Sequence, residues 1–407
     1  MTVEAEDPKT KVSFVMEIAV ALHHYGAAAH HIERVLKVFS RQIFKDGEFF
    51  ITPTSISLDI ETLDGSHFSR LKRIGPGGID LTKLSLTDEV GDMIIDKSIS
   101  FDEARSRLAH IATIPSTYPT WLILAAYALS SASFANLING SQWEVLWALP
   151  LGFLSGLGSL FLGRLGLGPG VLEAVISFVI AAIAGVAAIL NPSVDPKIIA
   201  LSALIVLVPG LSITIALLEL STKNLVSGTA RLMGAATELL TLAFGVMLGL
   251  FTVKTLGPAY SPIITQEALA LPHYLVIPVA SLTFAILFQC RVRDLGWVML
   301  ATLLAFTTNT IGNQHFGGGM GTFLSGVLLG FYSNAFARIL GRPALTTTIP
   351  GLILLVPGSL GYKSMAMLFG QEVLLSMNFA FEMIITAVAL VAGLSFGSTL
   401  LTPRRSY

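Results

Sequence analysis

Two Pro-Gly pairs lie inside long apolar stretches of the sequence, and each follows a Leu-Val dipeptide. They are Pro209-Gly210 and Pro357-Gly358, and the two prolines are 148 positions apart. Proline removes a backbone N–H and clashes with the carbonyl four residues earlier, so a helix must kink or break at each pair. A break inside a membrane frees backbone groups that can hold a polar solute where they line a cavity. The pairs therefore predict a substrate-binding role, and a packing kink is the alternative.

Two glutamates, Glu238 and Glu382, lie inside other apolar stretches. A carboxylate within a membrane span is unfavourable in lipid and usually faces a cavity or a partner. Its surroundings can shift its titration so that it exchanges protons near neutral pH. We predict that both residues couple proton movement to transport. The alternative is that each only hydrogen-bonds neighbouring helices.

Three further polar residues in the apolar stretches are candidates for contact with a substrate: Asn309, Asn334 and Lys363. Most asparagines inside membranes join helices through hydrogen bonds, which is the alternative for the two amides. Lys363 is the one cation that we expect deep in the spans. A substrate whose only charged groups are carboxylates would need such a cationic residue in its binding site.

The chain that positions these residues divides into a part suited to water and a part suited to lipid. The chain has 407 residues, of which 53% are hydrophobic and 13% charged, and its mean hydropathy is +0.74. Residues 1–117 hold 13 of the 25 basic and 17 of the 26 acidic residues. We therefore expect a water-soluble domain over 1–117, followed by a membrane domain. The net charge of −1 gives no reason to expect a nucleic-acid partner.

The first 117 residues predict a small α+β domain. Apolar spacing indicates one helix over 12–43, and β-branched residues indicate a strand over 49–60. Asp64-Gly65 is a hairpin signal, so 67–74 should return antiparallel. Two helices are expected near 84–97 and 101–112, with Asp80 placed to cap the first.

Four histidines lie on the first predicted helix, at positions 23, 24, 30 and 31. Their closest same-face pairs are seven residues apart, about 10 Å along a helix, which is too far for one metal ion. No P-loop, nucleophile elbow or GxGxxG motif is present. The single cysteine, Cys290, excludes a disulfide within the chain. We expect no metal, no cofactor and no enzymatic activity.

Ten apolar stretches are long enough to be membrane spans, which need about 20 residues each. They lie near 120–138, 143–163, 171–190, 198–219, 232–252, 273–290, 295–311, 319–338, 345–369 and 375–400. The N-terminus shows no cleavable signal peptide and is expected inside. The connectors then place nine basic residues inside and three outside, which fits the positive-inside rule and puts both termini in the cytoplasm.

Two landmarks recur at similar offsets in the two halves of the membrane domain. The Pro-Gly pairs are offset by 148 positions and the two glutamates by 144. We therefore predict two five-span units, 118–255 and 272–403. Because five is odd, the second unit must be inverted relative to the first. Inverted repeats are typical of secondary transporters, which bind the substrate near the midplane.

Several motifs together resemble the threonine/serine exporter family over essentially the whole chain. They are the two Val-Pro-Gly motifs and the residues Thr52, Pro53, Arg73, Gly78, Asp80 and Lys83, the last three within Gly-Ile-Asp-Leu-Thr-Lys-Leu. The resemblance implies a multi-pass protein of the cell inner membrane that exports small hydrophilic metabolites with the proton gradient. The chain is similar to the fused form of the family, which favours threonine and serine. His31 stands where the family often has Arg, and an imidazole there could make that position depend on pH.

Alternatives remain open at this point. Forms of the family split into two polypeptides are associated with export of dicarboxylates such as succinate. A membrane-anchored hydrolase that uses the soluble domain is an alternative from another class, as is a receptor. The expected partners are a small-molecule substrate and the lipid bilayer, and the sequence leaves room for a homo-oligomer.

Overall fold

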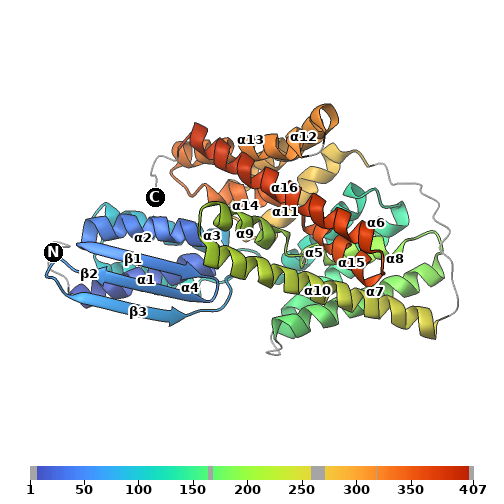
Figure 1. Ribbon diagram of the computed structural model, residues 1–407, viewed down its shortest axis with the longest axis horizontal. Helices are drawn as coiled ribbons and strands as arrows, with labels where there is room; N and C mark the ends of the chain where they lie inside the picture. Colours follow the sequence, from blue (N-terminus) through green and yellow to red (C-terminus); the bar gives the residue numbers. More distant parts are fainter. Residues whose placement is uncertain (1–6, 164–167, 258–270, 318, 403–407) are drawn as a thin grey trace.

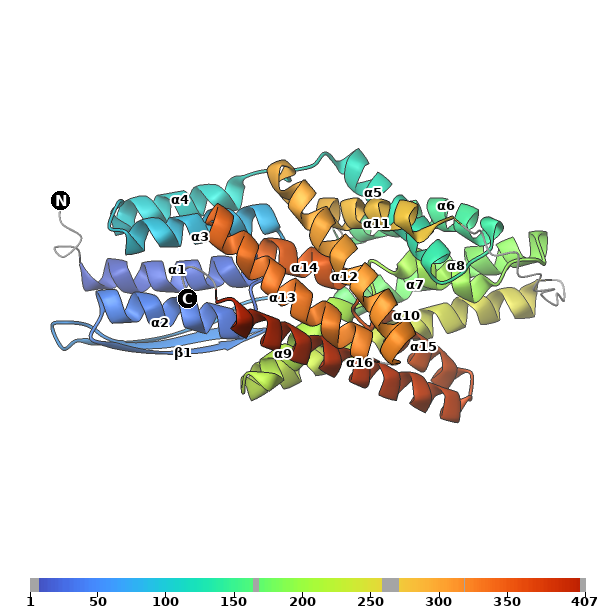
Figure 2. The same ribbon diagram turned by 90° about the horizontal axis from the view of Figure 1, so that it is seen from above.

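The computed structural model describes residues 7–163, 168–257, 271–317 and 319–402. An N-terminal α+β domain lies at one end of a long bundle of apolar helices (Figure 1). The last turns of the C-terminal helix return to the same end (Figure 2). The described residues are mostly helical, and the sheet found among them lies in the N-terminal domain.

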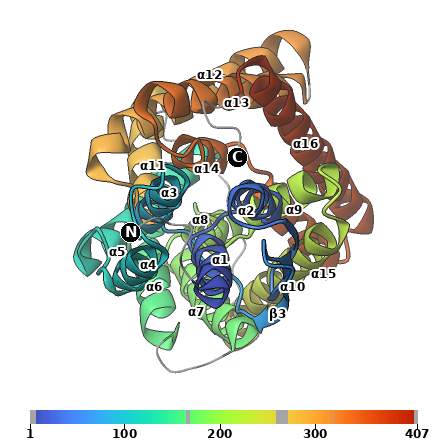
Figure 3. The ribbon, with the colours of Figure 1, turned by 90° about the vertical axis from the view of Figure 1, so that its left-hand side faces the viewer.

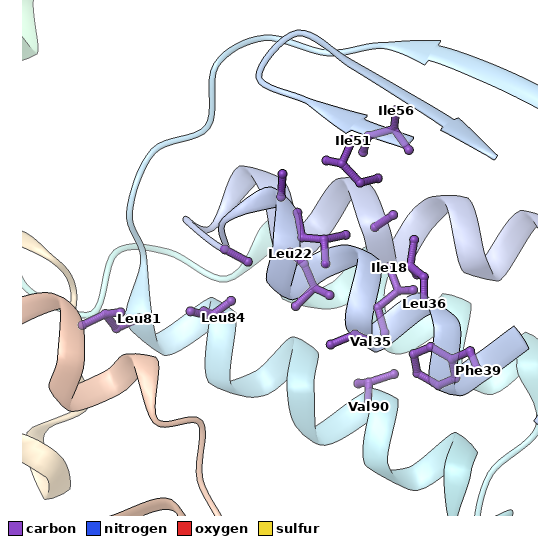
Figure 4. Packing of buried hydrophobic residues seen from close by; sticks show 14 of the residues in the cluster. Ile18, Leu22, Val35, Leu36, Phe39, Ile51, Ile56, Leu81, Leu84 and Val90 are labelled. Atoms are coloured by element: carbon purple, nitrogen blue, oxygen red, sulfur yellow. The ribbon is translucent and has the colours of Figure 1, made fainter. Parts of the chain in front are cut away.

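Four helices and one antiparallel sheet form the N-terminal domain. The elements are α1 (Pro8–His24), α2 (Ala29–Ile43), β1 (Asp46–Thr52), β2 (Ser55–Glu61), β3 (His67–Arg73), α3 (Leu81–Ile95) and α4 (Phe101–Thr113), and the sheet order is β1-β2-β3. Its core contains the rings of Phe14, Phe39 and Phe101, which meet edge to face. Ile51 and Ile56 of the sheet cover Ile18 and Leu22 of α1, as Figure 4 shows.

Two predictions for this domain are wrong and two are confirmed. The helix expected over 12–43 is broken between α1 and α2, where Gly26 has a φ of 103° and packs against the Gly78 carbonyl. The strand expected over 49–60 is two strands, joined by a two-residue turn at Pro53-Thr54. The hairpin at Asp64-Gly65 and the helices α3 and α4 are confirmed.

Thirteen helical segments make up the described part of the membrane domain. They are α5 (Thr120–Leu137), α6 (Gln142–Leu162), α7 (Pro169–Leu190), α8 (Pro196–Leu204), α9 (Gly210–Ser221), α10 (Leu225–Leu256), α11 (His273–Leu287), the short 3₁₀ helix η3 (Val292–Asp294), α12 (Leu295–Phe316), α13 (Met320–Leu340), α14 (Leu345–Ile353), α15 (Gly358–Phe369) and α16 (Val373–Leu400). Figure 3 shows α14 inside an arc formed by α11, α12, α13 and α16.

Within the described residues, eight helical stretches are long and apolar enough to cross a membrane. The predicted count of ten is therefore not confirmed. The stretch expected over 198–219 is divided into α8 and α9, of 9 and 12 residues, and α11 has 15 residues. Each of these is shorter than the roughly 20 residues that a straight span needs.

Small residues allow the long helices to approach closely. Gly245 and Gly249 of α10 lie against α7, and Gly393 and Gly397 of α16 lie against α13. A side chain at any of these positions would meet atoms of the neighbouring helix. The two contacts follow the small-xxx-small rule for helices packed in membranes.

Candidate functional site

The two Pro-Gly breaks meet in the interior of the membrane domain. Pro209 has φ −78° and ψ 42°, and Pro357 has φ −83° and ψ 32°. Both prolines leave the helical conformation in the same way, and α9 and α15 begin directly after them. A Cβ atom placed on Gly210 would lie 2.9 Å from the Cα of Gly358, and one on Gly358 would lie 2.9 Å from the Cα of Gly210. Only glycine permits this contact of two backbones.

This crossing places two helix N-termini inside the bundle. The first turn of a helix carries N–H groups without intrahelical partners. Proline at the N-cap has no side-chain acceptor for them, in contrast to Ser or Asp. The starts of α9 and α15 therefore present backbone donors and the positive ends of their dipoles, which suit a carboxylate.

A cavity of about 660 Å³ opens between the N-terminal domain and the membrane helices. Two of the domain's helices line one side, through His30, His31 and Arg34 of α2 and Asp88 and Asp92 of α3. The other side comes from α9, α13, α14, α16 and the segment between α13 and α14, and it includes Asn334, Arg342, Thr348 and Ser398. The cavity therefore combines residues that are more than 300 positions apart in the sequence.

Of the two arginines that line the cavity, one is already in an ion pair and the other is not. Arg342 forms an ion pair with Asp294, whose side chain is 1% exposed. Arg34 is exposed to the cavity and makes no hydrogen bond or ion pair with any described residue. Burial lowers the pKa of His30 to about 4 and that of His31 to about 3. Both imidazoles are thus neutral near pH 7, and His31 does not titrate in the physiological range.

Of the three predicted polar contacts, only Asn334 lies at the cavity. Its Nδ2 donates to the carbonyls of Ser398 and Leu401, at 3.3 and 2.7 Å, near the end of α16. An amide nitrogen has two hydrogens, so these bonds use both, and the amide oxygen is the atom left for a ligand.

Asn309 and Lys363 lie elsewhere. Asn309 Oδ1 accepts from Thr322 Oγ1 at 3.0 Å and from Asn313 Nδ2 at 3.1 Å, so it joins α12 to α13. The ammonium of Lys363 is 5.9 Å from the centre of the Phe379 ring, between α15 and α16. Neither residue lines the cavity.

The two glutamates are on different helices and in different surroundings. Glu238 is half-buried on α10 and lies close enough to Glu173 of α7 to interact with it electrostatically. Glu382 is exposed on α16. Neither carboxylate lines the cavity.

The family motif of the N-terminal domain builds the domain itself. Thr52 Oγ1 closes the β1–β2 turn at Pro53 with Ser55, and Arg73 pairs with Ser55 in the sheet register. Asp80 caps α3 through the backbone N–H of Lys83 at 2.9 Å, as predicted. The remaining contacts tie the motif to neighbouring segments: Gly78 N–H donates to the His24 carbonyl, and Lys83 Nζ donates to the Ala112 carbonyl.

Sequence reasoning missed how α2 is joined to the membrane domain. The N-cap of α2 is Ala28, whose methyl group cannot accept a hydrogen bond. Glu219 of α9 supplies the acceptor, because its Oε1 lies 3.0 Å from the Ala29 nitrogen. The same carboxylate, 0% exposed, also accepts from Ser227 at 2.9 Å and pairs with Arg231 at 3.0 Å. The only signal in the sequence was an acid near the end of an apolar stretch.

A second attachment joins α3 to the end of α11. The backbone N–H groups of Leu81 and Thr82 donate to the carbonyls of Phe288 and Gln289, at 2.9 and 3.0 Å. The free N–H groups of one helix therefore meet the free carbonyls of another. About two turns further along α3, Glu89 pairs with Arg291 at 2.6 Å.

No group of three or more His, Cys, Asp or Glu side chains in the described residues could hold a metal ion. The geometry is that of a membrane domain with a broken-helix crossing and, at one end, a cavity that charged side chains help to line.

Comparisons with known proteins agree with this architecture. Residues 13–253 match the family described as "Putative threonine/serine exporter", and residues 273–400 match "Threonine/Serine exporter, ThrE". The chain is 26% identical to a pheromone-regulated membrane protein 10 of Pichia sorbitophila, over 89% of this chain and 38% of that protein. It is 21% identical to an uncharacterized protein of Schizosaccharomyces pombe, over 88% of this chain and 44% of that protein.

A pheromone-regulated membrane protein 10 of Eremothecium gossypii is 23% identical, over 89% of this chain and 50% of that protein. The chain thus spans half or less of the length of these relatives. No solved structure matches. The two family matches cover the N-terminal domain and both parts of the membrane domain, and the chain belongs to the threonine/serine exporter family.

Proposed function

We propose that the protein is a secondary exporter of small polar metabolites, foremost threonine and serine, driven by the proton gradient across the cell inner membrane. The observation that carries the proposal is the contact of Gly210 with Gly358, where two interrupted helices start back to back. Two uncapped helix N-termini inside a membrane suit the carboxylate of an amino acid. Family membership supports the coarser role of a membrane exporter.

The proposal includes an inverted repeat of five spans, with α8–α9 and α14–α15 each counted as one interrupted span. Helix lengths support it, because α8 and α14 both have 9 residues and α9 and α15 both have 12. Rare backbone conformations recur at matching places as well. Asn139 and Gln289 have φ values of 61° and 54°, and Lys223 and Gln371 have 66° and 63°. Non-glycine residues seldom adopt such angles, so matched pairs favour a duplication.

The cavity would be the entrance on the side of the N-terminal domain. Leu218 of α9 lines it and lies eight residues, about 12 Å, along the helix from Gly210. Thr348 of α14 lines it too and precedes the break at Pro357. Both interrupted spans therefore lead from the cavity toward the crossing. The return of α16 to this end supports placing both termini in the cytoplasm (Figure 1).

Glu238 and Glu382 remain our candidates for proton coupling. The offset of 148 that relates the Pro-Gly pairs would match Glu238 with Thr386, one turn from Glu382. The two carboxylates would then have separate tasks in the two halves. Half-buried Glu238, near Glu173, is the stronger candidate because neighbouring carboxylates share protons readily.

A dicarboxylate exporter is the second candidate, and the cavity gives it a specific basis. Lys363 was the expected cation, but Arg34 and Arg342 are the cations that line the cavity. Two guanidinium groups at one cavity could serve a solute with two carboxylates.

Efflux from cells tests the function. Cells are loaded with a threonine-containing dipeptide, or with succinate, and efflux is compared with and without the protein, before and after a proton uncoupler. We expect threonine efflux that depends on the protein and stops with the uncoupler. Efflux of succinate alone would select the second candidate, and no efflux of either would reject both.

The coupling residues are tested in the same assay. Glu238→Gln and Glu382→Gln should uncouple efflux from the proton gradient while the protein stays in the membrane. Glu372→Gln is the matched control, since Glu372 is exposed at the start of α16. Coupled efflux in both variants at the level of the control would remove the coupling role.

A further inference from the structure

The N-terminal domain forms one wall of the cavity, and two side chains on this wall have polar groups without a hydrogen-bond or ion-pair partner among the described residues. Arg34 of α2 is exposed to the cavity without a bonding partner among the described residues. His30, one turn before Arg34 on α2, has a buried Nδ1 for which the described residues offer no hydrogen-bond partner. Polar groups of this kind are usually satisfied in a folded protein by solvent or a ligand.

The opposite wall favours an anion close to α14. This helix starts after Ala344, which has no side-chain acceptor to cap it, and both Ala344 and Leu345 line the cavity. Its dipole adds positive charge at this end, although the N–H groups of Thr346 and Thr347 already donate to the carbonyls of Pro343 and Ala344. Arg342 adds to it, although its guanidinium is already held by Asp294. The carboxylates of Asp88 and Asp92 line the cavity from α3, on the same wall as Arg34.

The volume fits a small solute. Binding sites for small molecules usually measure about 300–1,000 Å³, and this cavity measures about 660 Å³. Cationic and anionic side chains both line it, and a solute with a carboxylate and an ammonium group requires both. The neutral imidazoles of His30 and His31 contribute hydrogen bonds and no net charge.

We propose that this cavity binds small carboxylate-bearing solutes and that the N-terminal domain supplies their main counter-charge through Arg34. The domain is then part of the binding site of the exporter. This inference rests on the proposed function for the identity of the solute, and it adds a binding residue outside the membrane helices.

Calorimetric titration of the purified full-length protein in detergent tests the proposal. The probes are L-threonine, succinate and L-threoninamide, which lacks the carboxylate. Arg34→Gln should weaken the binding of L-threonine or succinate at least roughly 10-fold, because a charge-assisted hydrogen bond to the carboxylate is lost. Arg34→Lys should restore part of the affinity. Arg41→Gln is the matched control, since Arg41 is exposed on the same helix and does not line the cavity.

Equal affinity of the wild type and Arg34→Gln would overturn the proposal, and so would binding of L-threoninamide as tight as that of L-threonine. Lack of binding of all three probes would overturn it too. Efflux separates this failure from failure of the proposed function. If the wild type exports threonine and Arg34→Gln exports it equally well, the function stands and the role of Arg34 is wrong. If the wild type exports neither solute, the proposed function itself fails.

Discussion

A methyl group at the crossing of the two interrupted spans should be strongly destabilising. In Gly210→Ala, the new Cβ would lie 2.9 Å from both the Cα and the nitrogen of Gly358. Normal van der Waals contact begins near 3.4 Å, and both opposing atoms are backbone atoms that no rotamer change can move away. Overpacking typically lowers the free energy of unfolding by about 1–3 kcal/mol, and we expect the upper end of that range.

Gly234→Ala on α10 is the control, because no described atom apart from the backbone of its own helix lies within 4 Å of its added Cβ. Alanine is favoured over glycine inside a helix by about 1 kcal/mol, so this variant should be as stable as the wild type or more so. Thermal unfolding in detergent measures both variants, and threonine efflux reports on the pathway. If Gly210→Ala unfolds and exports like Gly234→Ala, the two breaks do not touch and the crossing cannot carry the proposed function.

Two further predictions concern the N-terminal domain. Glu219→Gln should lower the free energy of unfolding by about 3 kcal/mol, because it breaks the buried ion pair with Arg231, and hydrogen exchange at the start of α2 should rise because a charged acceptor of the Ala29 N–H becomes neutral. Glu17→Gln, in the half-exposed pair with Arg105, should change stability by less than about 1 kcal/mol, and equal effects of the two would contradict the buried role. The pKa values of His30 and His31 are lower in the folded state than the ordinary histidine value of 6.5. Below pH 6.5 the unfolded state therefore binds more protons at these two residues than the folded state does. Stability should therefore be constant above that pH and fall below it, by about 1–2 kcal/mol per histidine at pH 5, whereas a melting temperature unchanged from pH 7.5 to 5 would refute the burial.

Local signals predicted those elements whose ends are fixed by nearby residues. Asp80 caps α3 from three residues away, and Asp64-Gly65 turns β2 into β3. The break at Gly26 was missed because the apolar spacing continues through it. It depends on packing against Gly78, which a helical pattern does not report.

The count of spans differs for a similar reason. Residues 198–219 form one apolar stretch by hydropathy. In the structure the helix is interrupted at Pro209, and two short helices result. The break at Pro209 was predicted, but the short lengths of the two helices on either side of it were not. The cavity could not be predicted at all, because it forms only where α2 and α3 meet helices that are distant in the sequence.

The attachment of α2 and α3 to the membrane domain also sets an order of events during synthesis. Ala29 is 190 residues ahead of its cap Glu219, and Thr82 is 207 residues ahead of Gln289. At a synthesis rate of about 5–20 residues per second, these helices wait roughly 10–40 s for their partners. Until then, water must satisfy the first N–H groups of both helices. The N-terminal domain therefore leaves the ribosome first but reaches its final hydrogen bonding only after both parts of the membrane domain are in place.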